Sequence, residues 1–246
     1  MMRLDKYLAE SGMFSRSEAG RAVRGGRIAV DGVVIRDPSA KVDECAVSVT
    51  ADGQAVRWSR YRYIMLNKPS GTISTTDDDE RSVMKLLPPE FSRLGMFPCG
   101  RLDIDTVGLL LITNDGTTAH ELLSPKHHCE KTYGFKCLPL TSEMKRRLET
   151  GIELSDFTSK PCIVQLDDAT SGRITVTEGK YHQIKRMFHA VGSEITYLER
   201  LTFAGLVLDR RLARGEWREL TPDEVSRLTR LTRLRRDADI GTSEAE

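Results

Sequence analysis

The sequence predicts a protein that mixes short helices with β-strands and divides into a small amino-terminal module and a larger body. Apolar residues recur at helical spacing in the first 24 residues. Two apolar runs further along have the length of buried strands, from Arg62 to Leu66 and from Val107 to Ile112. A polar, turn-rich segment ends near Ser59. We therefore expect a module over residues 1–59, a body over 60–234 and a disordered tail over 235–246.

The composition narrows the class of protein. With 39% hydrophobic and 30% charged residues, the 246-residue chain has the balance of a soluble globular protein. No apolar stretch follows the amino-terminal Met-Met-Arg-Leu-Asp-Lys, so we expect neither a signal peptide nor a membrane anchor. Five scattered cysteines without a Cys-x-x-Cys pair indicate reduced thiols and a cytoplasmic location. Because the formal net charge is only +1, any binding of nucleic acid must depend on local basic patches.

Two helices are expected in the amino-terminal module. Leu4, Tyr7 and Leu8 recur at helical spacing, so residues 3–11 should form an amphipathic helix. Ser15 and Glu18 have the spacing of a capping box, which predicts that a second helix begins there and runs to about residue 24. An Asp-Gly pair at 31–32 then predicts a hairpin of two short strands within residues 27–35.

The second helix should have one basic side. At 100° per residue, the side chains of Arg16, Arg21 and Arg24 fall on one side and small apolar side chains on the other. Residues 1–36 contain seven Lys or Arg against four Asp or Glu. Such a basic helix face is suited to binding RNA phosphates, which attract cations whatever the base sequence. On charge alone, a solvated basic face is an equally good interpretation.

The loop from Gly100 to Thr106 (Gly-Arg-Leu-Asp-Ile-Asp-Thr) is the most informative stretch. It places two carboxylates, Asp103 and Asp105, directly before an apolar run that is typical of a central strand. An acid on a tight loop beside a rigid strand is a common way to fix a reactive group. A solvated turn beside a core strand is the alternative, since turns favour Asp and Gly for conformational reasons.

A second block, residues 178–188, reads Glu-Gly-Lys-Tyr-His-Gln-Ile-Lys-Arg-Met-Phe. A strand over 174–177 should turn at Gly179 into a helix with Ile184, Met187 and Phe188 on one side. Lys185 would lie on or near the opposite side, with His182 and Arg186. A carboxylate nucleophile needs a nearby fixed cation, because an opposite charge within about 4–6 Å favours its ionised form. Taken alone, the block could equally be a surface helix with solvated charges.

The rest of the body alternates between helical and strand patterns. Thr221 and Glu224 have capping-box spacing and should begin a last helix, whose end should leave the core at Leu234. His127, His128 and Cys129 are consecutive and cannot easily converge on one ion, so we expect no metal site. The acidic loop at 77–80 should repel a nucleic-acid backbone. Other expected elements are a helix over 83–87 stopped by two prolines, a helix over 117–123, and strands near 47–49 and over 131–137, 194–203 and 215–219.

Two groups of motifs resemble known families. The order Arg-Leu-Asp-Lys-Tyr-Leu, Ser-Arg-Ser-Glu-Ala and Arg-Ile-x-Val-Asp-Gly over residues 2–45 is similar to the S4 RNA-binding domain. The body resembles the pseudouridine synthases that act on ribosomal RNA. It carries Leu-Asn-Lys-Pro-x-Gly at 66–71, Arg-Leu-Asp-x-x-Thr-x-Gly-Leu at 101–109, Lys-Thr-Tyr at 131–133 and His-Gln-Ile-Lys at 182–185. The Gly-Arg-Leu-Asp-Ile-Asp-Thr form is that of the branch that modifies the small-subunit RNA.

The resemblance implies an α+β fold with a mixed, mainly antiparallel catalytic sheet behind a small S4-like domain. It implies that Asp103 is the essential carboxylate, Lys185 its cationic partner and Tyr133 the ring beside the target base. Ile184 would wall the pocket, and Arg101 would fill the space left by a flipped uridine. The implied reaction is the isomerisation of a uridine in 16S rRNA, at position 516, with no cofactor or metal. The implied partners are 16S rRNA or the assembling small subunit, no membrane is involved, and a monomer is the default.

Three other readings remain open at this point. The chain could modify a site in 23S rRNA, although the form of its motifs favours the small-subunit branch. It could also be a non-catalytic S4-type protein that binds RNA during ribosome assembly. A glycoside hydrolase that uses Asp103 and Asp105 ranks last. Its two carboxylates would have to lie on opposite sides of the sugar, about 5–9.5 Å from each other, and residues two apart in the sequence are not normally placed in this way.

Overall fold

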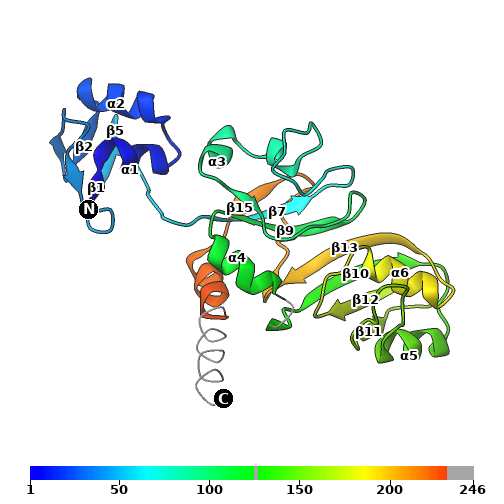
Figure 1. Ribbon diagram of the computed structural model, residues 1–246. Helices are drawn as coiled ribbons and strands as arrows, with labels where there is room; N and C mark the ends of the chain where they lie inside the picture. Colours follow the sequence, from blue (N-terminus) through cyan, green and yellow to red (C-terminus); the bar gives the residue numbers. More distant parts are fainter. Residues whose placement is uncertain (125–126, 232–246) are drawn as a thin grey trace, which may run out of the picture. The chain divides into compact units, whose positions relative to one another are not determined.

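The computed structural model describes residues 1–124 and 127–231, which form two compact units (Figure 1). The first unit holds residues 1–62 together with 88–96. The second holds residues 63–87 and the chain from 97 onward. The domain limits expected from the sequence stay predictions. Leu234 and the tail expected at 235–246 lie outside the described residues.

The first unit contains the two expected helices, α1 (Leu4–Glu10) and α2 (Arg16–Arg24). The capping box is present, since the N–H of Glu18 donates to the Ser15 hydroxyl and the N–H of Ser15 donates to the Glu18 carboxylate. The two-sided character of α2 is confirmed. Its three arginines (Arg16, Arg21, Arg24) are exposed, whereas Ala19, Ala22 and Val23 are buried against Leu4, Leu8 and Ile28.

A four-stranded antiparallel sheet completes this unit, in the order β3-β2-β5-β6. The hairpin is confirmed, because Asp31 and Gly32 both have positive φ (50° and 82°) and join β2 to β3. A short pair formed by β1 and β4 was not expected. The strands are β1 (Met2–Arg3), β2 (Ile28–Val30), β3 (Val33–Val34), β4 (Lys41–Val42), β5 (Val49–Ala51) and β6 (Gln54–Ala55).

The second unit is built on a nine-stranded mixed sheet. Seven strands run in the order β11-β12-β10-β13-β9-β7-β15, while β14 pairs with β13 and β8 pairs with β9. Every pairing in this sheet is antiparallel except that of β9 with β13, which confirms the α+β prediction. The strands are β7 (Tyr63–Lys68), β8 (Phe97–Pro98), β9 (Val107–Thr113), β10 (Lys131–Cys137), β11 (Ile163–Leu166), β12 (Ser171–Val176), β13 (Ile195–Phe203), β14 (Leu206–Val207) and β15 (Trp217–Glu219).

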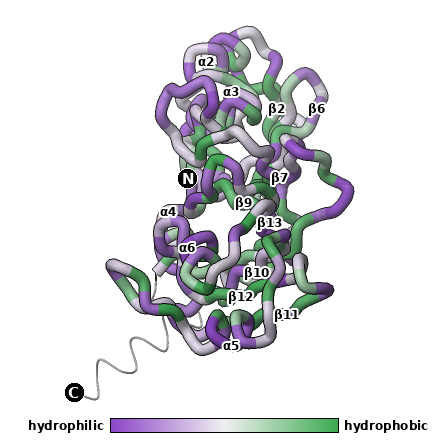
Figure 2. The backbone as a smooth tube through the Cα atoms, turned by 90° about the vertical axis from the view of Figure 1, so that its right-hand side faces the viewer, coloured by the Kyte–Doolittle hydropathy of each residue, from purple (hydrophilic) through white to green (hydrophobic). Residues whose placement is uncertain are grey.

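The strands β7 and β9 form the core of this sheet. All six residues of β7 and all seven of β9 are buried, and the apolar run of β9 stands out in Figure 2. Burying one Leu or Ile side chain stabilises the fold by about 1.5–3 kcal/mol, so this pair of strands provides a rigid base for the loop that precedes β9.

The parallel pair is the seam of the sheet. Only two residue pairs join β9 to β13, namely Val107 with Glu199 and Gly108 with Arg200. Gly108 has φ +100°, and a Cβ at this position would overlap the backbone oxygen and nitrogen of Arg200. Glycine is needed here for both reasons, since an L side chain rarely adopts this φ and no space exists for one.

Helices flank the sheet. In Figure 1, α6 lies against β13 and α5 lies beside β11. The helices expected at 117–123 and around Ile184 are confirmed, whereas α5 was not expected. The helices of this part are α4 (Gly116–Leu123), α5 (Ser142–Thr150) and α6 (Gln183–Ala190).

The expectation for residues 83–89 was partly wrong. The predicted helix is a four-residue 3-10 helix, η1 (Val83–Leu86). The expected stop is present, since η1 ends at Leu86 and Leu87, the residue before Pro88, is extended. A separate helix that was not expected, α3 (Pro89–Arg93), begins at the second proline. Proline is well suited to the first helical position, where its fixed φ fits the helix and its missing N–H would have no partner anyway.

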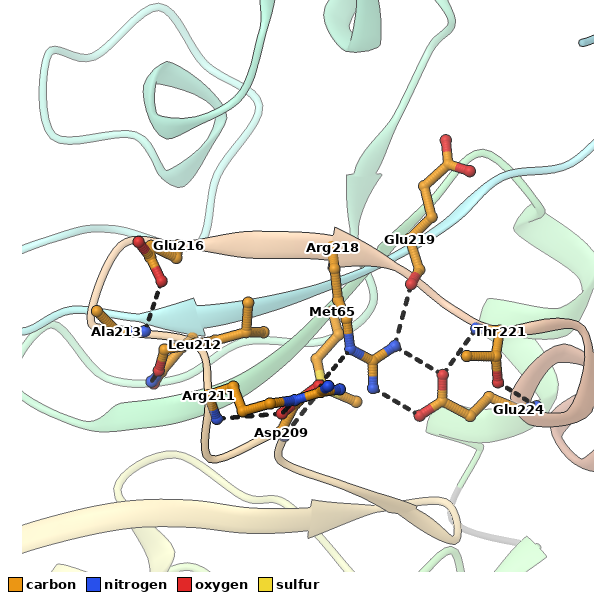
Figure 3. Close-up of polar contacts among 11 residues, drawn as sticks. Met65, Asp209, Arg211, Leu212, Ala213, Glu216, Arg218, Glu219, Thr221 and Glu224 are labelled. Atoms are coloured by element: carbon orange, nitrogen blue, oxygen red, sulfur yellow. Dashed lines mark hydrogen bonds and ion pairs between the residues drawn. The ribbon is translucent and has the colours of Figure 1, made fainter.

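The carboxy-terminal segment is tied together by charged hydrogen bonds (Figure 3). The Arg218 guanidinium donates to Asp209 through Nε (2.8 Å) and to Glu224 through both terminal nitrogens (2.7 and 2.8 Å). These bonds lower the pKa of the Glu224 carboxyl to about 2. Thr221 and Glu224 also form the expected capping interaction at the start of the helix over 222–231. The network therefore joins β15, the loop before it and this last helix.

No helix in residues 1–124 and 127–231 has the length and apolar character needed to cross a bilayer. In the same residues, no group of three or more His, Cys, Asp or Glu side chains is placed to hold a metal ion. His127 and His128 contact different partners, the Glu121 carboxylate (2.8 Å) and the Lys160 amine (3.2 Å).

Candidate active site

The loop that carries Asp103 is fixed from below by a buried lysine. Lys68, at the end of β7, has no exposed surface, and its ammonium donates to the backbone oxygens of Asp103 (3.0 Å), Ile104 (3.3 Å) and Thr106 (2.9 Å). It also donates to the oxygen of Pro69 (3.2 Å). One charged group therefore holds three carbonyls of the loop, which orients Asp103 before any substrate arrives.

Burial lowers the pKa of the Lys68 ammonium to about 8, against the opposing effect of the nearby Asp105 and Asp103 carboxylates. The carbonyl contacts also favour the charged form. The sequence did not reveal this role. The available signal was a charged residue at the end of a strand whose first four residues are apolar.

Asp103 and Lys185 are brought together as predicted. The Lys185 ammonium lies 3.1 Å from Oδ2 of Asp103 and 2.5 Å from Oδ1 of Asp105, so it bridges the two carboxylates. Burial would lower the pKa of Lys185, but its hydrogen bonds to Asp105 and Asp103 raise it above the ordinary value. Lysine at 185 is therefore a permanent cation at neutral pH.

The two carboxylates differ in their surroundings. Asp103 is 25% exposed and lines a pocket, whereas Asp105 is 63% exposed and is not part of the pocket wall. Burial alone would raise the pKa of Asp105, but the hydrogen bond and charge of Lys185 lower it. Asp105 thus acts on the cation from outside the pocket. The sequence placed it beside Asp103 but did not show that it shares Lys185.

The pocket lies between the Asp103 loop, β10 and α6. Tyr133 from β10 and Ile184 from α6 are buried in its wall, and the exposed Arg101 stands at its edge. The Thr106 hydroxyl is buried and finds no hydrogen-bond partner among the described residues. A cleft between the loop and the Lys185 helix is therefore present, with an acid, a cation and an aromatic ring facing one space.

A tight turn over residues 178–183 closes one side of the pocket. The Gln183 side chain accepts from the N–H of Lys180 (3.0 Å) and donates to the Glu178 carboxylate (2.7 Å). The side chains of Gln183 and Glu178 are buried. His182, the residue before α6, has a left-handed backbone (φ +48°) and lies 3.7 Å from Oδ1 of Asp103. Such a conformation costs a non-glycine residue about 1–3 kcal/mol and is typical of functional sites.

Comparison with known proteins gives two family matches. Residues 62–190 match the RNA pseudouridylate synthase family, and residues 2–48 match the S4 domain. The chain is 44% identical to an RNA pseudouridine synthase of Bacillus subtilis, YtzG, over 91% of this chain and 97% of that relative. It is 40% identical to the ribosomal small subunit pseudouridine synthase A of Escherichia coli, over 92% of this chain and 99% of that relative.

A solved structure agrees with these matches. A crystal structure of a pseudouridylate synthase superposes with a TM-score of 0.65 at 34% identity, covering 93% of this chain and the whole of that one. A carboxylate paired with a lysine beside an aromatic pocket, in a chain that also carries an S4 domain, defines an enzyme that modifies RNA. The chain belongs to the RNA pseudouridylate synthase family.

Proposed function

We propose that the protein converts one uridine of 16S ribosomal RNA to pseudouridine. The observation that carries this proposal is 40% identity, over nearly the full length of both chains, to an enzyme named for the small ribosomal subunit. The Gly-Arg-Leu-Asp-Ile-Asp-Thr loop, which the structure builds around Lys68 and Lys185, supports it. The active unit is proposed to be one chain, because Asp103, Tyr133 and Lys185 all come from the same chain.

The reaction breaks the bond between N1 of uracil and C1′ of the ribose and forms a bond between C5 and C1′. The proton leaves C5 and N1 gains one, so the change is an isomerisation without oxidation or reduction. We propose Asp103 as the carboxylate that adds to C1′ or removes the 2′ proton, with Lys185 holding it in position through an ion pair of 3.1 Å. Tyr133 is proposed to stack on the flipped base, Ile184 to wall the pocket, and Arg101 to occupy the vacated space in the RNA.

The S4 domain is proposed to bind RNA phosphates through Arg16, Arg21 and Arg24. All three side chains are exposed on one side of α2. We place the enzyme in the cytoplasm with its RNA, since all five of its cysteines are free thiols.

A pseudouridine map tests the function. Unmodified 16S rRNA, free and in partly assembled particles, is incubated with the protein and read by carbodiimide treatment and primer extension, with Asp103→Asn as the inactive control. One new stop with the wild-type protein alone supports the proposal. A stop only in 23S rRNA would transfer the function to the large subunit. RNA binding without any stop would favour a binding protein that assists ribosome assembly.

The arginines of α2 give a separate expected result. The double variant Arg21→Ala/Arg24→Ala should bind 16S rRNA more weakly at every sequence tested, because two phosphate contacts are lost. The slope of log Kd against log salt concentration should become shallower by about 2. Lys41→Ala changes the same type of charge on another element of the first unit and should leave the slope nearly unchanged. Equal slopes for the double variant and wild type would remove these arginines from the RNA interface.

Because of the lowered pKa of Lys68, we expect a rise in pH to have opposite effects on the activity and on the stability of the protein. Above pH 8 the ammonium loses its proton, so its grip on the Asp103 loop weakens and single-turnover conversion of 16S rRNA should slow. Between pH 8 and 10.5 the unfolded chain holds a proton at Lys68 that the folded chain has lost. The contribution of Lys68 to the free energy of unfolding should therefore rise in this window.

Lys185 should not contribute to these two effects, because its raised pKa keeps it charged between pH 8 and 10.5. Lys68→Met should be slower at all pH values and should lack the alkaline fall. An unchanged fall, with the same midpoint, in Lys68→Met would contradict the assignment to Lys68. Urea unfolding of the wild-type protein and of Lys68→Met at pH 7.5 and 9.5 tests the predicted rise in the free energy of unfolding.

A further inference from the structure

Tyr181 is an exposed aromatic side chain that does not help to hold the fold together. It is 75% exposed, and its hydroxyl has no hydrogen-bond partner in the part of the chain that the structure describes. Its ring stacks on that of His182, with ring centres 3.9 Å apart and planes at 16°. His182 lines the pocket and Tyr181 lies on its outer side, so the two rings form a step from the reactive carboxylate to solvent. We call this pair the aromatic ledge.

The aromatic ledge is held in place by its surroundings. The Gln183 side chain fixes the backbone of Lys180, and the Arg186 guanidinium donates to the carbonyl of Tyr181 (3.4 Å). Arg186 is itself anchored by Asp156 and Ser155. The left-handed backbone of His182 lets two consecutive rings stack face to face. One exposed ring and one partly buried ring are thus held in place at the mouth of the pocket, which a solvated surface turn would not require.

Two cationic side chains lie near the aromatic ledge: Lys180, which precedes Tyr181 in the chain, and Arg186, which is paired with Asp156. Lys180 and Arg186 both lie over the ring of Phe157, at 5.7 and 5.3 Å from its centre. Exposed aromatic rings beside cations are the combination by which proteins hold single-stranded nucleic acid, because rings stack on bases while cations meet phosphates. An apolar protein partner would meet these charges at a cost in desolvation, so the surroundings favour RNA.

We propose that the aromatic ledge is a second base-binding site, where Tyr181 stacks on the base of a nucleotide next to the target uridine. The inference rests on the proposed function, since the flipped uridine would occupy the pocket on the inner side of His182. A neighbouring nucleotide loses a stacking partner when the target uridine is flipped out of the strand. The outer face of Tyr181 offers that base a new stacking partner, which offsets part of the cost of opening the strand.

The test compares RNA with and without bases. The probes are a labelled oligouridylate of about ten nucleotides and an abasic strand with the same sugar-phosphate length. Tyr181→Ala should bind the oligouridylate about 5- to 100-fold more weakly than wild type and bind the abasic strand equally well. Tyr181→Phe should retain wild-type affinity. The salt slope should not change in Tyr181→Ala, because no charge is lost.

Val207→Ala, on β14, is the matched control, since Val207 is also a largely exposed apolar side chain (65%) and does not line the pocket. Wild-type affinity of Tyr181→Ala for the oligouridylate, or an equal loss on both strands, would overturn the proposal. Neither result depends on catalysis. If the wild-type protein forms no pseudouridine in rRNA, the proposed function fails while the binding data still decide on the aromatic ledge. On the unmodified rRNA that the wild-type protein converts, Tyr181→Ala should raise KM and leave kcat within about twofold.

Discussion

Asp103→Asn is expected to bind RNA and to form no detectable pseudouridine, a loss of at least about 10³-fold in rate. Asparagine keeps the size of the side chain but can neither attack C1′ nor accept the 2′ proton as a carboxylate does. The fold should survive, because Asp103 is partly exposed and Lys185 keeps Asp105 as an ion-pair partner. Single-turnover conversion of 16S rRNA and a parallel binding titration measure the two effects.

Asp105→Asn is the matched control for this result. It removes the same charge two residues away, from a carboxylate that contacts Lys185 but lies outside the pocket wall. We expect it to remain active, with a loss of up to about tenfold as Lys185 becomes less firmly held. An inactive Asp105→Asn beside an active Asp103→Asn would exchange the roles of the two residues.

Gly108→Ala is expected to destabilise the second unit by about 3 kcal/mol or more. The added Cβ would meet the Arg200 backbone directly across the β9–β13 pairing, and φ +100° disfavours any L side chain. The strands would have to separate where only two residue pairs join them. Urea unfolding followed by circular dichroism measures the change, and failure to accumulate as folded protein is the extreme form of the same result.

Gly116→Ala provides the comparison for this variant. Gly116 begins α4, has an ordinary φ, and a Cβ there would meet nothing within 4 Å. This substitution should be neutral or slightly stabilising, because alanine favours the helix and restricts the unfolded chain. Equal unfolding midpoints for Gly108→Ala and wild type would show that the seam tolerates a side chain.

Much of the fold could be predicted because hydrophobic periodicity and capping are local properties. The capping box at Ser15, the Asp31-Gly32 hairpin and the buried run of β9 each follow from residues close together in the sequence. The pairing of Asp103 with Lys185 was predicted for a different reason, since the motif resemblance supplied a contact that local patterns do not contain.

The remaining features depend on tertiary surroundings. A lysine at the end of a strand gives no local sign that it will bind three carbonyls of a loop more than thirty residues away, as Lys68 does. The left-handed conformation of His182 depends likewise on contacts around the turn, because histidine has no strong preference for it. Asp105 falls on an unspecified position of the Arg-Leu-Asp-x-x-Thr motif, although its carboxylate lies closer to the Lys185 ammonium than that of Asp103 does.

The seam also determines when the pocket around Asp103 can form as the chain is synthesised. The strands β7 and β9, with the Asp103 loop between them, emerge early from the ribosome, whereas β13 follows about 90 residues later. Tyr133 and Lys185 come from elements that pair with or pack on β13. An unfinished chain therefore holds Asp103 without the groups that complete its pocket. The pocket around Asp103 is complete only after β13 has been made and the two halves of the sheet have joined.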